Sequence, residues 1–458
     1  MKLLKRILNW EPINGVLAER VITFGYFFVL LASLLAAYIT ANHVAQWFLF
    51  NGDSLWTEDY LQDWLVHGVD MKTWMTPGAP NFFPEMLIYG LFRYATGNVY
   101  LGFVGFGLVK IIFYGFIFYN LLSLITDISI RHKLWFSLLG ISVLLLASIL
   151  LGSQFSYTRI LDFWQLFSPG GHGGAIANAL IAILLILCWF RSPDKGYLWF
   201  FLLFMLSVMA SMSDRLYMVW FALPALGAMA CLFLLGYTTW KSLVWLTGVF
   251  LMADVLGRRI FLWLTPLQQV PYGFSFKEGW NSTIQFYWVL FKEGWYHPLV
   301  LFSYISLVII TFSALVKTWK RTDKTLDAKE KGILFLLPYS AIVLPISFLA
   351  IMSINRPETQ YFTGGDLLAL SLWGFLLVTT PFGLQLWNNK WFHAVIITAL
   401  MGGMGLLALK SHIPLTTMLT PANPYSTMIS CLDSHKNELG SGMGITDYWQ
   451  ARDYLCWG

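Results

Sequence analysis

Four carboxylates stand close together in the stretch "FNGDSLWTEDYLQDW" (50–64), in a chain where only 12% of the residues are charged. They are Asp53, Glu58, Asp59 and Asp63. A carboxylate beside a low-dielectric surface has a raised proton affinity, which suits a general base that deprotonates an acceptor hydroxyl or amine. Asp53 lies nearest to the preceding apolar run, so we predict it as the catalytic base, with Glu58 or Asp59 second. The alternative is that these acids only solvate an external loop.

A glycine-rich stretch, "SPGGHGG" (168–174), combines four glycines with His172 directly before an apolar run. Glycines let backbone amides approach an anion closely, and the amides at the start of the following helix add positive potential. The stretch therefore predicts a phosphate site that includes His172. A flexible turn is the alternative interpretation.

A pair of opposite charges, Asp214 and Arg215, lies between two apolar runs in "SMSDRLYMVW". Because an arginine can form charge-assisted hydrogen bonds to phosphate, Arg215 is a candidate phosphate ligand. The alternative is that the two side chains neutralise each other and are structural.

Further charges interrupt apolar runs: Asp254, Arg258 and Arg259 in "FLMADVLGRRIFLWLTP", and Lys110 in "FGLVKIIFYG". Ionisable groups at membrane depth are costly, so they normally face a polar cavity, a partner or a lipid headgroup. We predict that Arg258 and Arg259 bind a donor phosphate, with extension to the membrane interface as the alternative. Arg356, in "SINRPETQY", is a further candidate for phosphate or sugar.

The segments that carry these residues have the composition of a membrane protein. The chain has 458 residues, of which 57% are hydrophobic and 17% aromatic, and its mean hydropathy is +0.64. The absence of ten-residue alternating strands favours helices over an outer-membrane barrel. We therefore predict an all-α polytopic bundle with about eleven spans, each near the ~20 residues that a crossing helix needs. They are 22–48, 99–125, 134–152, 174–190, 197–211, 216–236, 242–265, 298–316, 333–353, 365–387 and 392–409.

Basic residues are distributed unevenly between the connections. About 16 of the 29 Lys and Arg residues fall on one set of mostly short connections, such as "DISIRHK" and "KTWKRTDKTLDAKEK". Cytoplasmic loops carry this excess, so the N-terminus is expected inside and the C-terminus outside. The first residues are not expected to form a cleavable signal, because the apolar run after them is long enough to span.

The expected external side consists of long aromatic loops, including 49–98 and 153–173, and a tail. Loops of this length are usually functional or disordered. The aromatic content of these loops disfavours disorder, and amphipathic helices are expected in them. We therefore divide the chain into a transmembrane region (1–410) and a small external tail (411–458). Cys431 and Cys456 lie in that tail, and whether they form a disulfide stays open.

This organisation resembles the GT-C class of integral-membrane glycosyltransferases, which includes protein O-mannosyltransferases, oligosaccharyltransferases and the aminoarabinose transferase of lipid A. The resemblance rests on the aspartate of "GDSLWTED" in a long first external loop, on the inside N-terminus and on the odd number of spans. It covers roughly residues 20–410. The "WWDYG" motif of oligosaccharyltransferases does not occur in this sequence, which disfavours that branch, and the tail is smaller than the external domain of many members.

The resemblance implies an inverting transfer of a sugar from a polyprenyl-phosphate or diphosphate donor to a lipid, glycan or protein acceptor. Asp53, Glu58 and Asp59 are then the catalytic candidates. The donor phosphate is assigned to Arg215, Arg258, Arg259, Arg356 and His172. The expected location is the bacterial inner membrane, with the site facing the periplasm.

Other function classes stay open. A lipid or glycan transporter also needs intramembrane charge such as Lys110 and Asp254, although no internal repeat is evident. A polymerase or ligase of lipid-linked polysaccharides is a third candidate, and it differs in using a preassembled chain. The cofactor is unknown: carboxylates can bind a divalent cation through oxygen ligands, but no spacing here demands a metal. The net charge of +5 does not imply a nucleic-acid partner.

Overall fold

The computed structural model describes residues 15–43, 52–74, 76, 78–152, 166–266, 276–293, 297–321, 325–354 and 359–411. Arg356, Cys431, Cys456 and the predicted tail beyond Ser411 lie outside these ranges. So does the side chain of Asp53, although its backbone belongs to a helix.

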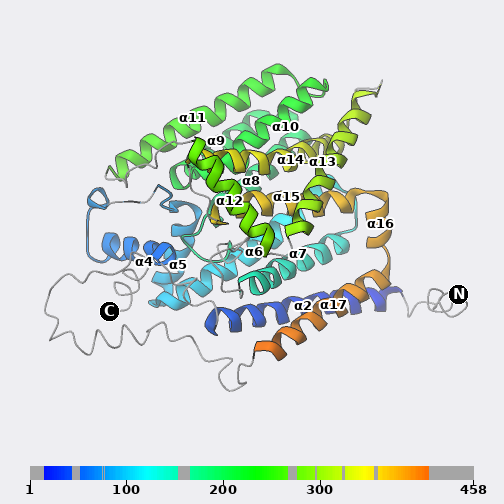
Figure 1. The fold of residues 1–458 in the computed structure, drawn as a ribbon, viewed down its shortest axis with the longest axis horizontal. Helices are drawn as coiled ribbons and strands as arrows, with labels where there is room; N and C mark the ends of the chain where they lie inside the picture. The colour runs from blue at the N-terminus through cyan, green and yellow to red at the C-terminus, as the bar shows by residue number, and fades with distance from the viewer. Residues whose placement is uncertain are drawn as a thin grey trace, which may run out of the picture.

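The described residues fold almost entirely into helices (Figure 1). The α-helices are α2 (Gly15–His43), α4 (Gly52–Leu65), α5 (Leu87–Thr96), α6 (Val99–Ile125), α7 (Ile130–Gly152), α8 (Gly173–Arg191), α9 (Gly196–Ser213), α10 (Leu223–Leu234), α11 (Trp240–Leu264), α12 (Phe276–Glu293), α13 (His297–Trp319), α14 (Ala328–Ile354), α15 (Thr359–Thr379), α16 (Pro381–Trp387) and α17 (Lys390–Ser411). Short 3₁₀ or π turns are η1 (Met71–Thr73), η2 (Phe82–Met86), η4 (Pro193–Lys195) and η5 (Met218–Ala222).

Polar residues at the connections begin several of these helices. The Asn98 side chain accepts a hydrogen bond from the Leu101 amide at the start of α6, and Thr239 does the same for Ser242 in α11. Before α14, the Asp327 carboxylate accepts from the Glu330 amide while the Glu330 side chain accepts from the Asp327 amide. Such caps satisfy amides that have no partner within the helix.

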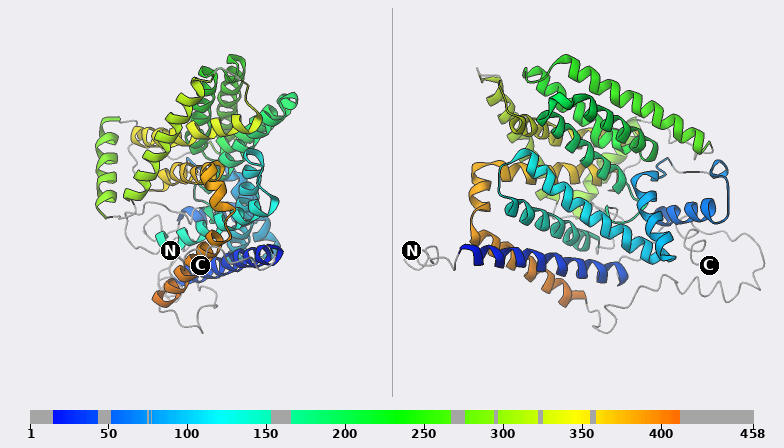
Figure 2. Two further views of the ribbon diagram at one scale, coloured as in Figure 1. Left: turned by 90° about the vertical axis from the view of Figure 1, so that its right-hand side faces the viewer. Right: turned by 180° about the vertical axis from the view of Figure 1, so that it is seen from behind.

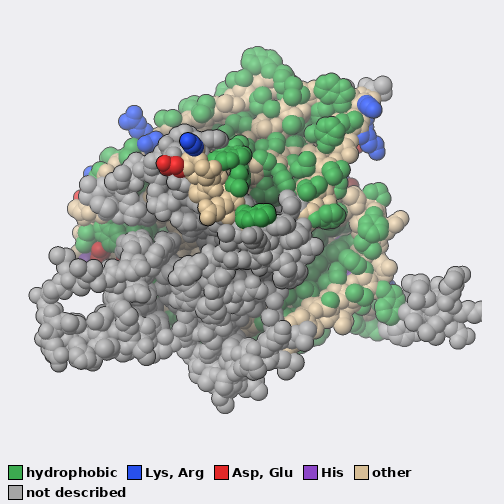
Figure 3. All heavy atoms as spheres, in the orientation of Figure 1, with side chains coloured by type: hydrophobic (Ala, Val, Ile, Leu, Met, Phe, Trp, Pro, Cys, Tyr) green, Lys and Arg blue, Asp and Glu red, His purple; other side chains and the backbone are tan. Residues whose placement is uncertain are grey.

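Six helices in the described residues are long and apolar enough to cross a membrane, by length and composition: Leu17–Tyr38, Val99–Ile125, Gly173–Arg191, Pro193–Ser213, Phe302–Trp319 and Ala328–Ser353. Their outward faces are apolar, with Phe24, Ile112 and Phe302 each at least 70% exposed. Apolar side chains also cover the described upper part of the surface in Figure 3, whereas Lys and Arg gather towards the two ends. The chain is thus an all-helical membrane protein in its described parts.

The predicted count of eleven spans is matched only in part. The regions 134–152 and 392–409 fall within α7 and α17, 242–265 coincides with α11 except for its last residue, and 216–236 contains the shorter η5 and α10. The expected single span 365–387 is instead a pair of helices bent by 84°. Thr380 and Pro381 cause the break, because the Thr380 hydroxyl accepts from the Gly383 amide and proline favours the first helical position. The orientation of the termini stays a prediction.

Helix α8 lies at the centre of the bundle and packs against α6, α9 and α14. Small residues in its first half, including Gly174, Ala175, Ala179 and Ala182, are buried and let neighbouring helices approach closely. α4 and α5 gather at one end of the bundle, and α16 crosses the other (Figures 1 and 2). A separate aromatic cluster fixes α4, η2 and α5 to α6 and α11, so the first long loop is a packed layer.

Candidate functional site

The first long loop contributes the predicted catalytic carboxylates through α4. Glu58 is only 1% exposed, and its carboxylate accepts hydrogen bonds from Arg93 Nε and the Tyr89 hydroxyl of α5, each at 2.7 Å. Asp59 is also buried. Glu58 therefore links α4 to α5 through these two hydrogen bonds. This is a structural role, and it does not depend on any part in catalysis. Asp53 lies in the first turn of α4.

A sharp turn before α5 connects this loop to the bundle interior. Asn81 has a left-handed backbone (φ 55°) and begins η2. Its amide donates to the carbonyl oxygen of Ser213 (3.1 Å), and the Phe83 amide donates to the Ser213 hydroxyl (2.7 Å). The end of α9 thus holds both sides of the turn. As a result, Phe82, Phe83 and Met86 face a cavity described below, while Glu85 faces α8.

Glu85 occupies the place where the glycine-rich stretch predicts a phosphate. Its side chain is fully buried, and its carboxylate lies against Gly174 in the first turn of α8: a methyl group built on Gly174 would stand 2.5 Å from Glu85 Oε2. Burial raises the Glu85 pKa from 4.5 to about 8, while Lys110 and the Gly174 amide act in the opposite direction. The acidic group at this helix start is therefore one of the protein's own side chains.

Lys110 lies beside the same helix start. Its side chain is 1% exposed, and Nζ donates to the carbonyl oxygen of Gly173 at 3.1 Å. The ammonium also stands over the rings of Phe106 and Tyr114, 5.5 and 5.7 Å from their centroids. A charge at membrane depth is thus stabilised by a carbonyl, two aromatic faces and the nearby Glu85.

The charged residues of "SMSDR" do not pair with each other. Asp214 Oδ2 lies 2.7 Å from His172 Nδ1, and Asp214 Oδ1 accepts from the Leu216 amide. Arg215 instead contacts Asp254 of α11 at 3.1 Å and is half-exposed. The structure therefore brings His172 to the interior with Asp214, and it leaves Arg215 at the surface beside α11. We call Asn81, Glu85, Lys110, His172, Asn178 and Asp214 the Glu85 cluster.

Arg258 and Arg259 are exposed on α11, after Asp254. Within the described part of the chain, neither arginine forms a hydrogen bond or an ion pair with the Glu85 cluster. Both lie about one turn before Trp263 and Leu264 at the end of the helix. The predicted phosphate ligands that the structure describes thus fall into two groups. His172 lies in the interior, whereas Arg258 and Arg259 lie on α11 and Arg215 lies beside that helix, in the connection after α9.

A cavity of about 760 Å³ lies under the first long loop. Its wall comes from α4, η1, η2, α5, α9 and the end of α11, and no charged side chain lines it. Leu61, Phe82, Met86 and Met209 are among its lining residues. A cavity of this size and lining suits an apolar ligand or part of one.

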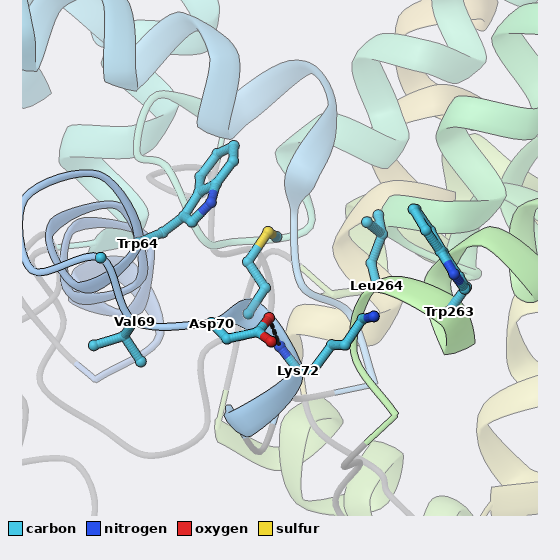
Figure 4. Close-up of a pocket in the computed structure, with 8 residues that line it drawn as sticks. Trp64, Val69, Asp70, Lys72, Trp263 and Leu264 are labelled. Atoms are coloured by element: carbon cyan, nitrogen blue, oxygen red, sulfur yellow. Dashed lines mark hydrogen bonds between the residues drawn. The ribbon is translucent and has the colours of Figure 1, made fainter.

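A smaller, polar pocket of about 290 Å³ adjoins this cavity, and Trp64, Met71 and Leu264 line both. Figure 4 shows Asp70 and Lys72 on one side of the pocket and Trp263 with Leu264 on the other. The Lys72 ammonium stands 5.5 Å from the Trp263 ring centroid, and the Asp70 carboxylate accepts from the Lys72 amide at 3.0 Å. Together the two spaces match the polarity of an amphiphile: the larger cavity is apolar, and the smaller pocket, which we call the mouth, is lined by charged and aromatic side chains.

Several of these residues were missed from the sequence: Lys72, Asn81, Glu85, Asn178 and Trp263. A signal existed for Glu85, because "NFFPEM" places an acid after a proline inside an apolar stretch. Among the described side chains, no group of three or more His, Cys, Asp or Glu residues could hold a metal ion.

Fold and site define a polytopic helical membrane protein with buried charge and an amphiphile-shaped cavity at one end. No protein-family model, curated protein or solved structure matches the chain.

Proposed function

We propose that the protein is a membrane glycosyltransferase that moves a sugar from a polyprenyl-phosphate or diphosphate donor to an acceptor on the external face of the membrane. The observation that supports this best is the pair of adjoining spaces. The cavity of about 760 Å³ would take the start of a prenyl chain, and the pocket with Lys72 would take the charged head. Each buried methylene would contribute about 0.8 kcal/mol to binding.

The charges around the mouth fit such a donor. Lys72 stands in the polar pocket, and Arg258 and Arg259 lie exposed one turn before Trp263 on α11. A phosphate held there would receive charge-assisted hydrogen bonds, each contributing roughly 1.5–3 kcal/mol. Arg356 lies outside the described residues and stays a candidate, whereas His172 is too deeply buried to reach this mouth without rearrangement.

The acceptor would be deprotonated by a carboxylate of the first long loop. Asp53 is the leading candidate, since Glu58 is already bonded to Arg93 and Tyr89. In an inverting displacement, the acceptor oxygen or nitrogen forms the new bond to the sugar carbon, the bond to the phosphate oxygen breaks, and the acceptor proton passes to Asp53. Lys72 and the arginines would stabilise the charge of the leaving phosphate.

The test is transfer of labelled sugar from polyprenyl-phosphate donors by the purified protein. We expect Asp53→Asn to reduce turnover by about 10²–10⁴-fold, as for loss of a general base. Arg258→Ala should weaken donor use, while Arg321→Ala, which removes an exposed partner of Glu330, serves as control. Unchanged turnover in Asp53→Asn would exclude this residue as the base.

A lipid or glycan transporter is the second candidate. The buried charges Glu85 and Lys110 beside an irregular stretch of backbone at η2 favour it, because transporters place such groups at their binding sites. Movement of a labelled lipid across vesicles without sugar transfer from any donor would support this alternative.

A further inference from the structure

Helix α12 carries a row of exposed apolar side chains. Trp280, Ile284 and Trp288 recur at every fourth position and are 45%, 45% and 58% exposed. Side chains four residues apart lie on the same face of a helix, so these three form one stripe along α12, which we call the Trp280 row. An uncovered row of this kind is a candidate interaction surface.

The strip of α12 beside this row is polar. Glu278, Asn281 and Gln285 follow each other at intervals of three and four positions, and all three are exposed. The buried positions on the remaining side of the helix are Gly279 and Thr283. Among its described side chains, α12 therefore has one strip that faces the protein, one exposed apolar strip and one exposed polar strip.

Neither bulk water nor the bilayer core suits both exposed strips. In water, the Trp280 row would leave apolar surface exposed at a cost of roughly 25 cal/mol per Å². In the bilayer core, the Glu278 carboxylate and the two amide side chains would lose their hydrogen-bond partners. The boundary between lipid headgroups and acyl chains accepts both strips, and tryptophan is enriched there in membrane proteins. The side-chain pattern of α12 is thus that of a helix lying in this boundary.

The neighbours of α12 already belong to a lipid-covered surface. α12 is not one of the six described helices that could cross a membrane, but it packs against two of them, α13 and α14, and it runs obliquely across α14 in Figure 1. The Trp280 ring meets Phe348 of α14 edge to face, with the centroids 6.4 Å apart. On α13, Phe302 and Phe312 are 70% and 68% exposed. Since a crossing helix meets acyl chains on such a face, the Trp280 row extends a surface that lipid covers.

A second copy of the chain is the other candidate occupant of this row. A stable protein interface buries about 800 Å² on each partner. A fully buried aromatic side chain contributes about 250 Å² at most, so three half-exposed side chains fall short of that area. A lipid surface has no such minimum, which favours lipid as the occupant.

We propose that α12 docks on a lipid surface: the Trp280 row inserts into the boundary between headgroups and acyl chains, and Glu278, Asn281 and Gln285 face the headgroups and water. Because α12 packs on α14, this contact also fixes the depth of that helix in the bilayer. The assignment uses no feature of the donor, the cavity or the transfer reaction, so it stands or falls separately from the proposed function.

The test compares two adjacent positions of α12 in the full-length protein, reconstituted in nanodiscs of phosphatidylcholine and phosphatidylglycerol. Ile284→Cys probes the Trp280 row and Gln285→Cys the polar strip, each with a nitroxide label after replacement of the four native cysteines by alanine. Collisions with O₂, which concentrates among acyl chains, and with a water-soluble nickel chelate report the surroundings of each label. We expect the ratio of O₂ to nickel collisions to be several-fold higher at position 284 than at 285. Equal ratios would overturn the proposal, as would a label at 284 that is shielded from both reagents.

A second measurement leaves the native cysteines in place. The photocrosslinker p-benzoylphenylalanine is introduced at position 284, at position 285 and, as a lipid-facing reference, at position 302 of α13. Irradiation in vesicles that contain tritiated phosphatidylcholine should label the protein strongly from positions 284 and 302 and several-fold less from 285. Equal lipid labelling from 284 and 285 would overturn the proposal. A crosslinked dimer formed from position 284 would overturn it in favour of a second copy of the chain.

Discussion

Glu58 Oε1 of α4 lies 2.7 Å from Arg93 Nε of α5, and this ion pair closes the first long loop on itself. The Glu58 side chain is 2% exposed and that of Arg93 23%, so the pair is largely shielded from water. Among the described residues, loss of the arginine would leave the buried carboxylate with the Tyr89 hydroxyl as its one hydrogen-bond partner. The loop that frames the cavity therefore depends on this contact.

We predict that Arg93→Met destabilises the protein by about 3 kcal/mol, as removal of one partner of a buried pair does. The measurement is chemical or thermal unfolding in detergent. Arg321→Met provides the control, because its contact with Glu330 is exposed on both sides (48% and 43%) and such pairs contribute about 0–1 kcal/mol. Equal losses of unfolding free energy in the two variants would show that the Glu58–Arg93 pair stabilises the protein no more than an exposed ion pair does.

Gly174→Ala should be strongly destabilising, because the added methyl group would stand 2.5 Å from the Glu85 carboxylate. Overpacking of this kind typically costs about 1–3 kcal/mol. Gly402→Ala is the matched control: Gly402 also lies in a helix, α17, and a methyl group there meets nothing within 4 Å. Alanine should stabilise that helix by up to about 1 kcal/mol. Both free energies of unfolding can be measured in one series.

The double variant Gly174→Ala with Glu85→Ala tests the cause. Removal of the Glu85 carboxylate creates room for the methyl group, so the cost of Gly174→Ala should become smaller in that background. Contacting residues show such coupling in double-mutant cycles. An unchanged cost would mean that the backbone of α8, rather than the carboxylate, excludes alanine.

The sequence predicts the helical class well, because a run of about 20 apolar residues in a membrane can satisfy its backbone hydrogen bonds by forming a helix and by few other structures. Helices cover the described parts of most predicted spans. The break at Thr380 was missed: its flanks are equally apolar, and only the Thr-Pro pair indicates it. The apolar pattern continues on both sides of this pair, so hydrophobicity alone predicts one unbroken helix.

The site was less predictable than the fold. The charges of "SMSDR" and "LMADVLGRR" are visible as unusual, but their partners come from distant segments: Asp214 binds His172, and Arg215 binds Asp254. Lys72 and Trp263 form one pocket although almost 200 positions separate them in the chain. Such pairings depend on tertiary packing, which local spacing does not encode.

The raised pKa of Glu85 predicts a dependence of stability on pH. Its carboxyl group has a pKa of about 8 in the folded protein against 4.5 ordinarily, so between these values the folded state holds a proton that the unfolded state has lost. This contribution is complete below about pH 4.5, declines as the pH rises, and is lost above about pH 8. Unfolding measured from pH 5 to 9 should show the decline in the parent and a smaller one in Glu85→Gln.

A surface carboxyl group provides the comparison that makes this pH experiment specific. Asp127, at the surface, has a pKa lowered by Lys329, so it titrates below this window and Asp127→Asn should leave the decline unchanged. A decline of the same size in Glu85→Gln would assign it to other groups.

Lys72→Met should weaken donor use in the transfer reaction, with the main effect on KM. The substitution keeps an unbranched apolar stem but removes the ammonium that stands over Trp263. One charge-assisted hydrogen bond of roughly 1.5–3 kcal/mol corresponds to about a 10–150-fold change. Lys241→Met is the control, since Lys241 is exposed at the opposite end of α11, the helix that carries Trp263. A loss confined to kcat would instead place Lys72 at the leaving phosphate in the transition state, since uniform binding changes KM alone.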